Sequence, residues 1–313
     1  TEGVTGSGTL CQIQFQCITT GSSGLNFVDK PTYTYLKDPN ENDIAFDSID
    51  GIVKVGSSEK YLSVPFHSQT KTYYSGPASL ETAFDFYGED IPQLEIADVT
   101  RTYPNVTYTD ELRRASHFSN NSISMGQEMP QNITGYSLRK LGYGAFEKCP
   151  MSLPQLMFSV YSGYPVIVLT WYDLSKNRGH YRVVVGYNQT HIVFHDPWNN
   201  TAWGGEYGGP NMALDYSTFL DLWNCSNYWG LFVHPWTVII NLEILEPGVL
   251  NVTATISYVC PEVFETTSYL ASSCKATIIL TPGLSLGPGE NPKKTLGPGM
   301  LLPGTSAAVR WII

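Results

Sequence analysis

The stretch Val64–Gly88, VPFHSQTKTYYSGPASLETAFDFYG, decides the fold because it has the pattern of a loop leading into a buried helix. Ser75, Gly76 and Pro77 predict the helix start, since serine caps helix N-termini and proline is tolerated in the first turn. Apolar residues then recur at the i, i+3, i+4, i+7 spacing of one helix face, namely Leu80, Ala83, Phe84 and Tyr87. Gly88 follows where a left-handed C-cap is expected. One side of this helix should therefore be buried.

Two later segments that are typical of strands each contain a polar residue of interest. His180 lies in GHYRVVVGY and Asp196 in VFHDPW, both Val/Ile-rich segments typical of strands, and Gln69 lies six residues before Ser75. In this order and spacing the four residues resemble the motifs of the papain-like peptidases, in particular the bacteriocin-processing, double-glycine-leader branch, over about residues 60 to 240. The resemblance implies Ser75 at the nucleophile position, His180 as base, Asp196 as the carboxylate that orients the imidazole, and Gln69 as oxyanion donor.

Ser75 departs from this family, which places cysteine at the nucleophile position. A helix N-terminus and a neighbouring imidazolium can ionise a thiol near neutral pH, but they do not ionise a hydroxyl. Serine needs a base to remove its proton during attack. Three origins of Ser75 remain open: a natural loss of catalysis, an engineered inactive variant, or a natural serine enzyme.

The composition limits the partners of the chain. With 313 residues it is long enough for two or three domains, and its net charge of −10 argues against nucleic acid or an anionic membrane as partner. No apolar run is long enough for a membrane span. The chain starts at Thr1 without a methionine or signal peptide, which is typical of a processed chain or a fragment.

Sequons and cysteines favour an extracellular or cell-surface location. The Asn-X-Ser/Thr sequons exceed the number expected by chance and begin at Asn105, Asn120, Asn132, Asn188, Asn199, Asn224 and Asn251. The six cysteines, at positions 11, 17, 149, 225, 260 and 274, have no C-x-x-C spacing, so we expect neither a metal nor another cofactor. We predict a disulfide between Cys260 and Cys274.

The predicted fold class is a multidomain chain, in which a central α+β papain-like domain is flanked by all-β segments. Residues 1–56 resemble the later half of a cohesin-like β-sandwich, with CQIQFQC from Cys11 as a strand, Gly21–Gly24 as a turn, Leu25–Val28 as a short strand, and IVKV as another strand. Residues 60–242 form the papain-like domain. In residues 243–313, Pro-Gly turns between alternating strands predict a small β-sandwich.

Within the central domain, helices precede strands. After the Ser75 helix, we predict helices in IPQLEIADVTRTY, Met151–Gly163 and YSTFLDLW, and strands in PVIVLTWY, HYRVVVGY, HIVFHDPW and GLFVHPWTVII. The Gly-rich segment NNTAWGGEYGGPN after Trp198 predicts a loop beside the cleft.

Two function classes fit these patterns. The first is a papain-fold surface protein whose catalysis has lapsed and which serves in assembly, as a filament or surface layer, or in binding. The second is an active peptidase or acyl-transfer enzyme acting on an extracellular peptide. The N-terminal segment has too few strands for a sandwich of its own, and an unpaired edge attracts another strand. Either residues 1–56 pack with residues 243–313 of the same chain, or strands of a neighbouring copy complete them, and we favour the second option. The expected partners are therefore copies of the chain itself, joined by β-strand complementation, or a peptide or surface protein.

Overall fold

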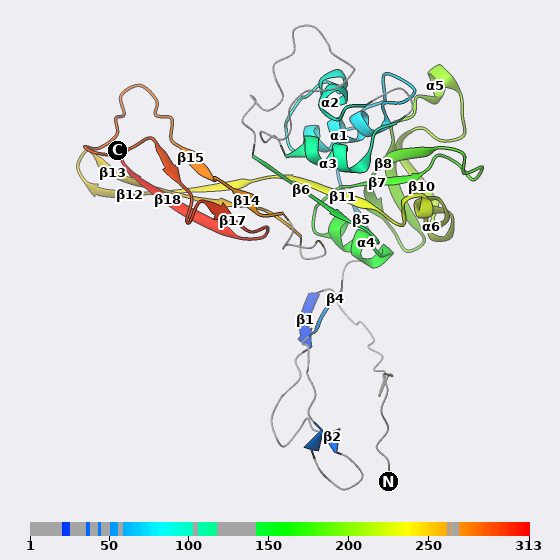
Figure 1. Cartoon of the computed structure of the whole chain (residues 1–313), viewed down its shortest axis with the longest axis horizontal. Coiled ribbons are helices and arrows are strands. Elements are labelled where there is room, and N and C mark those ends of the chain that lie inside the picture. The colour runs from blue at the N-terminus through cyan, green and yellow to red at the C-terminus, as the bar shows by residue number, and fades with distance from the viewer. Residues whose placement is uncertain are drawn as a thin grey trace. The chain divides into compact units, whose positions relative to one another are not determined.

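The computed structural model describes residues 21–25, 36–37, 43–44, 51–55, 59–102, 106–117, 142–261, 264 and 269–313 (Figure 1). The chain divides into two units, residues 1–58 and residues 59–313, and each is described by itself. Among the described residues, no helix combines the length and apolar character needed to cross a membrane.

The described residues of the N-terminal unit form two antiparallel strand pairs. Strand β1 (Gly21–Leu25) pairs with β4 (Gly51–Val55), and β2 (Leu36–Lys37) pairs with β3 (Asp43–Ile44). Strand β4 confirms the predicted IVKV strand. The predicted turn at Gly21–Gly24 is wrong, because pairing with β4 holds this Gly-Ser segment extended against its local turn preference. The predicted Cys11 strand lies outside the described residues.

The helical half of the second unit begins with α1 (Ser75–Phe86), followed by α2 (Gln93–Val99) and α3 (Thr109–Ser116). Helices α1 and α2 were expected from the apolar periodicity, whereas α3 was not. Helix α1 is buried continuously from Gly76 to Phe84, because the central sheet contacts one side of it and α2 and α3 pack on it as well. Gly88 has φ +90°, as expected for the position after a C-cap.

A seven-stranded antiparallel sheet forms the centre of this unit. Its order is β10-β9-β8-β7-β11-β6, and β5 pairs with β8. The strands are β5 (Lys60–Tyr61), β6 (Tyr143–Lys148), β7 (Val166–Trp171), β8 (Gly179–Tyr187), β9 (His191–Asp196), β10 (Gly209–Asp215) and β11 (Gly230–Pro235). The other helices among the described residues are α4 (Leu153–Tyr161), α5 (Asn200–Trp203), α6 (Tyr216–Trp223) and the short 3₁₀ helix η2 (Asn224–Ser226). The predicted strands at β7, β8 and β9 and the helices at α4 and α6 are thus confirmed.

Each face of the sheet packs in its own apolar cluster. Residues of α1 to α3 share a buried cluster with Tyr181 and Val183 of β8, whereas α4 and α6 share one with Val184 on the opposite face. Alternate residues of a strand point to opposite faces, so β8 contributes to both clusters. The central domain is therefore a layered structure of helices and a sheet, in which β8 is buried between the apolar clusters on the two faces of the sheet.

The C-terminal part is all-β over the residues that the structure describes. Its strands are β12 (Thr237–Glu246), β13 (Val249–Ser257), β14 (Ala271–Ser272), β15 (Lys275–Thr277), β16 (Lys293–Thr295), β17 (Met300–Leu301) and β18 (Ser306–Ile312). They form a three-stranded sheet, β12-β13-β18, and two short pairs, β14–β17 and β15–β16. The predicted single strand GLFVHPWTVII is two strands, β11 and β12, which belong to different sheets. The ring of Trp236 between them lies 4.7 Å from that of Tyr258.

Cys260 and Cys274 are free cysteines in the structure, so the predicted disulfide is not present. Each thiol donates a hydrogen bond to a nearby backbone carbonyl instead, from Cys260 to Pro261 at 3.6 Å and from Cys274 to Ala271 at 3.5 Å. Sequence proximity favoured this pair, but each thiol has a separate backbone carbonyl as its partner.

Candidate active site

Ser75 is the first residue of α1, and not its N-cap as the sequence suggested. The N-cap is Tyr74, and no side chain caps this end. The Ser75 hydroxyl oxygen accepts a hydrogen bond of 3.4 Å from the backbone N–H of Tyr181, the residue that follows His180 on β8. The N–H groups of a first helical turn have no intrahelical acceptor, so they are available to a negative charge at this position.

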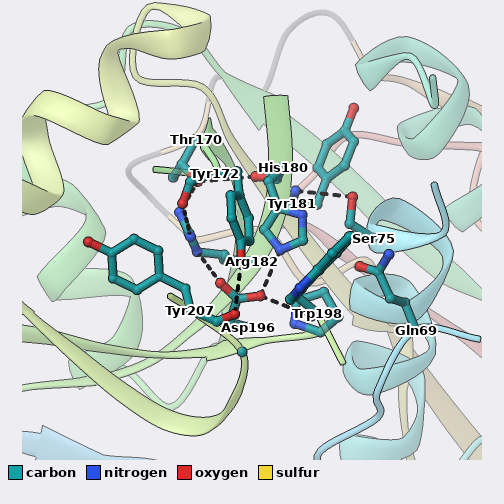
Figure 2. A network of polar contacts seen from close by, with 12 residues as sticks. Gln69, Ser75, Thr170, Tyr172, His180, Tyr181, Arg182, Asp196, Trp198 and Tyr207 are labelled. Carbon is teal, nitrogen blue, oxygen red and sulfur yellow. Dashed lines mark hydrogen bonds and ion pairs between the residues drawn. The ribbon is translucent and has the colours of Figure 1, made fainter. Parts of the chain in front are cut away.

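His180, Asp196 and Arg182 form a buried polar chain beside Ser75 (Figure 2). The Nε2 atom of His180 lies 2.7 Å from Oδ1 of Asp196, and the Nε of Arg182 donates to Oδ2 at 2.8 Å. The backbone N–H of Trp198 donates to Oδ1 at 2.9 Å. The carboxylate therefore holds the far nitrogen of the imidazole, which leaves Nδ1 as the nitrogen available to a reacting group.

The Arg182 guanidinium is fully buried and connects three segments. It donates to the hydroxyl of Thr170, to the carbonyl of Trp171 at 2.8 Å and to the carbonyl of Tyr172 at 2.7 Å. The Thr170 hydroxyl in turn donates to the carbonyl of His180 at 3.1 Å. Strands β7 and β8 are thereby locked to Asp196 at the end of β9, which fixes the place of the carboxylate.

The pKa values of Asp196 and His180 are both lowered, for different reasons. Burial opposes the charge of Asp196, but the positive charges of His180 and Arg182 and the hydrogen bonds to the carboxylate outweigh it, and the Asp196 pKa lies well below its ordinary value. Burial lowers the pKa of His180, and Arg182 and Arg178 lower it further against the opposing effect of Asp196. At neutral pH, Asp196 is therefore charged and balanced by Arg182, while His180 is neutral.

Aromatic side chains cover the His180–Asp196 pair. The rings of Tyr172 and Trp198 lie 5.3 and 6.3 Å from the His180 ring, both edge-to-face. Both of these rings also contact the exposed guanidinium of Arg178, at 4.0 and 4.3 Å. This cover excludes water from the imidazole–carboxylate hydrogen bond, which strengthens it.

The segment after Trp198, predicted as a loop, contains helix α5 and the start of β10, and the residues between these two elements contact this aromatic cover. The indole N–H of Trp198 donates to the carbonyl of Gly204 at 2.6 Å, and the Tyr172 hydroxyl donates to the carbonyl of Tyr207 at 3.1 Å. A Cβ on Gly208 would lie 2.4 Å from the carbonyl oxygen of Trp198, and its φ is +147°. The glycine thus permits a close approach of two backbone segments.

We expect Gly208→Ala to lower the free energy of unfolding more than Gly209→Ala does, by roughly 1–3 kcal/mol. Both glycines have positive φ, but a Cβ on Gly209 would meet nothing within 4 Å, so this variant is matched for backbone strain alone. Denaturant unfolding of the two variants measures the difference. Equal losses would show that the loop relaxes away from the Trp198 carbonyl.

Gln69 is buried beside the start of α1. Its Nε2 donates to the carbonyl of Lys71 at 2.8 Å, and its Oε1 is buried without a hydrogen-bond partner among the described residues. Its backbone N–H donates to the carbonyl of Pro197 at 2.7 Å, which ties the loop to the residue after Asp196. Figure 2 shows the Gln69 side chain next to Ser75. The structure thus brings together all four predicted residues.

Gln93 holds the Gln69 loop from outside. Its Oε1 accepts from the backbone N–H of Thr70 at 2.9 Å, and its Nε2 donates to the carbonyl of Ser68 at 2.9 Å and to Glu81 on α1 at 2.6 Å. The residues on both sides of Gln69 are therefore fixed by one buried amide.

Arg182 and Gln93 are not among the residues predicted from the sequence. Arg182 could have been found, because it lies two residues after His180 on a predicted strand and so points to the same face. Gln93 has no such signal, since its partners lie in a different part of the chain.

Comparison with solved structures finds peptidases over just over half of the chain. The peptidase domain of Streptococcus ComA, a bi-functional ABC transporter involved in quorum sensing, is 17% identical, with 56% of this chain and 98% of that chain covered and a TM-score of 0.37. A putative C39-like peptidase from Bacillus anthracis is 16% identical, covering 56% and 97%, with a TM-score of 0.37. The Carica candamarcensis cysteine protease CMS1MS2 is 12% identical, covering 57% and 98%, with a TM-score of 0.39.

The comparison with curated proteins gave no match. The sequence profile of the Peptidase_C39 like family matches residues 61–228, which is more than half of the chain and includes Gln69, Ser75, His180 and Asp196. The chain therefore belongs to the Peptidase_C39 like family.

Proposed function

We propose that the peptidase-like domain has lost catalysis and that the chain is a secreted, glycosylated surface protein that uses this domain in assembly or binding. The observation that carries the proposal is the hydroxyl of Ser75 beside an otherwise complete His180–Asp196 pair. The supporting argument is chemical, because the helix start and the imidazole would activate a thiol but leave a hydroxyl protonated.

The hydrogen bonds of Ser75 agree with this proposal. Its Oγ accepts from the Tyr181 backbone, and among the described residues it has no hydrogen bond to His180. A serine nucleophile requires the base within hydrogen-bond reach of its proton, although such bonds can tighten only when substrate binds. The ground state therefore lacks the contact that a serine hydrolase uses.

The proposed surface location is supported by the sequons in the described part of the chain. Asn224 is exposed, and Asn188, Asn199 and Asn251 are half-buried, so none of these four lies in the core. Glycans require surface positions in a secreted protein. Copies of the chain, a peptide or another surface protein are the proposed partners.

We expect the unmodified chain to show no turnover above background with a general peptide library, monitored by mass spectrometry. A variant with Ser75→Ala provides the matched control, because it removes the hydroxyl while keeping the helix start. Turnover by the unmodified chain that this control abolishes would contradict lapsed catalysis.

An active serine hydrolase is the second candidate, and the neutral His180 with Asp196 on its far nitrogen favours it. This is the arrangement in which an imidazole accepts a serine proton. Labelling by a fluorophosphonate probe distinguishes the two functions. Covalent labelling at Ser75 that is lost in His180→Asn would support the hydrolase, and no labelling would support the lapsed enzyme.

A further inference from the structure

Strand β12 is an exposed apolar edge strand. All ten of its residues are exposed, and in the described part of the chain its only strand neighbour is β13. Its exposed apolar side chains are Val238, Ile239, Ile240, Leu242, Ile244 and Leu245. A long apolar edge with unpaired backbone groups on one side is the surface to which another strand adds.

One face of β12 continues a face that is buried elsewhere in the same sheet. Val238, Ile240 and Leu242 stand opposite Ile256, Ala254 and Val252 of β13. These three β13 residues are buried, as are Val309 and Trp311 in the paired positions of β18. On β12, however, the exposed fraction is 61% for Ile240 and 66% for Leu242. The core-forming face of this sheet therefore extends one strand beyond its cover.

We propose that two copies of the chain pair through β12, antiparallel, about a two-fold axis at Asn241. Direct opposition then joins Val238 with Ile244, Ile240 with Leu242, and Ile239 with Glu243, each pair occurring twice. The result is a continuous six-stranded sheet across the two copies. A two-fold contact of this kind is self-complementary and closes at the dimer.

The apolar pattern selects this register. In an antiparallel pair, residues directly opposite each other lie on the same face of the sheet. The two-fold axis must therefore pass through a residue, and not between two residues, for the apolar side chains of both copies to share one face. A two-fold axis at Asn241 gives each of the four apolar residues of this face an apolar partner in the other copy; they are Val238, Ile240, Leu242 and Ile244. An axis at Ile240 instead leaves Ile244 without a partner in the strand. A centre at Leu242 places Val238 opposite Glu246, beyond the bulge between Ile244 and Glu246.

The charges agree with the same register. Glu243 faces Ile239 of the other copy, so no carboxylate stands opposite a carboxylate. A centre at Glu243 would instead place the two copies of this residue against each other, which is unfavourable.

Chain connectivity leaves room for the second copy. One residue, Trp236, separates β12 from β11 of the central sheet, and β12 ends in the turn at Pro247 and Gly248. Antiparallel pairing places the start of one β12 beside the end of the other. The two central domains therefore lie at opposite ends of the joined strands.

This pairing rests on the self-association in the proposed function and names its surface. It does not depend on the state of Ser75, which the peptide and probe assays test separately. Self-association through another surface would overturn the pairing but leave the proposed function in place.

The first experiment is cross-linking of the full chain with Asn241→Cys. In the proposed register residue 241 meets its own copy, at the 4.5–5.5 Å Cα spacing typical of opposite residues, which a disulfide can span. Mild oxidation should convert most of the variant to a covalent dimer on a non-reducing gel. In the matched control Glu243→Cys, the two cysteines lie about 14 Å apart, and no dimer should form.

The unmodified chain under the same oxidation controls for its own cysteines, among which Cys149 is exposed. Dimers of Glu243→Cys equal to those of Asn241→Cys would overturn the register. A ladder of higher covalent species specific to Asn241→Cys would overturn the closed two-fold contact.

The second experiment uses charge at Ile239, measured by sedimentation over a range of concentrations. Ile239→Glu places a carboxylate opposite Glu243 twice per dimer and should raise the dimer Kd by roughly tenfold or more. Ile239→Lys places an ammonium there and should dimerise at least as well as the unmodified chain. Ile279→Lys, at a residue 90% exposed but outside β12, should leave the Kd unchanged. The proposal would be overturned if the unmodified chain stays monomeric at all concentrations. It would also be overturned if Ile239→Glu and Ile239→Lys change the dimer Kd equally.

Discussion

Ser75→Cys is expected to create a reactive thiol and to give the chain peptide hydrolysis that the unmodified protein lacks. The residue is half-buried at the first position of α1, and the neutral imidazole of His180 on the adjacent strand can accept the thiol proton. Catalytic thiols in such sites have pKa values of about 3.5–7.5 instead of 8.5. For scale, removing the nucleophile of a peptidase triad lowers turnover by about 10⁶-fold.

The pH dependence of alkylation measures this thiol pKa, and peptide cleavage measures the recovered turnover. His180→Asn in the Ser75→Cys background is the control, since it removes the base while leaving the thiol at the helix start. In that double variant we expect the alkylation midpoint to move back toward 8.5 and cleavage to disappear. A residue-75 thiol that titrates near 8.5 even with His180 present would show that the two side chains do not interact.

Arg182→Met is expected to lower the free energy of unfolding by about 3–5 kcal/mol, the scale of breaking a buried ion pair by removing one partner. The guanidinium is buried and donates to Asp196 and to backbone carbonyls of Trp171 and Tyr172. Methionine keeps much of the volume but leaves these acceptors without their donor. Denaturant unfolding of the variant and the unmodified chain at pH 7 measures the loss.

Two controls separate charge from packing in this experiment. Arg182→Lys keeps the charge but not the planar set of donors, so we expect an intermediate loss. Adding Asp196→Asn to Arg182→Met should cost less than the sum of the two single variants, because the unpaired carboxylate is gone. A loss below about 1 kcal/mol for Arg182→Met would contradict the central role of this ion pair.

The acid dependence of stability gives an independent readout of the same pair. The Asp196 pKa is lowered in the folded state, so this group stabilises the protein fully above its ordinary pKa of about 3.9, and the contribution is lost as the pH falls from there through the lowered pKa of the folded state. Without Arg182 the pKa is lowered less and this contribution is smaller. Both proteins lose this contribution equally until the pH reaches the less lowered Asp196 pKa of the variant, so we expect their stability difference to narrow only below about pH 3.9.

Local patterns predicted the elements that carry the site. The apolar spacing from Leu80 to Tyr87 and the Val/Ile-rich segments around His180 and Asp196 predicted α1, β8 and β9, because side-chain periodicity is a property of each segment alone. The order of Gln69, Ser75, His180 and Asp196 was also sufficient to indicate the family. These features need no knowledge of which segments become neighbours.

Local patterns failed where pairing with a distant segment competes with local preference. Gly21–Leu25 has the composition of a turn, but its ladder with β4 makes it a strand. Cys260 and Cys274 are close in sequence, but their thiols contact separate carbonyls.

The sequence by itself thus determined the helix and strands that hold the four candidate residues, and the substitution of a hydroxyl for the thiol at residue 75. Only the tertiary structure decided how they are supported: that Arg182 balances Asp196, that Gln93 fixes the Gln69 loop, and that β12 is left uncovered at a sheet edge. The physical reason is that periodicity and capping act within a few residues of the chain. Burial, ion pairing and edge exposure depend on which distant segments the fold brings together.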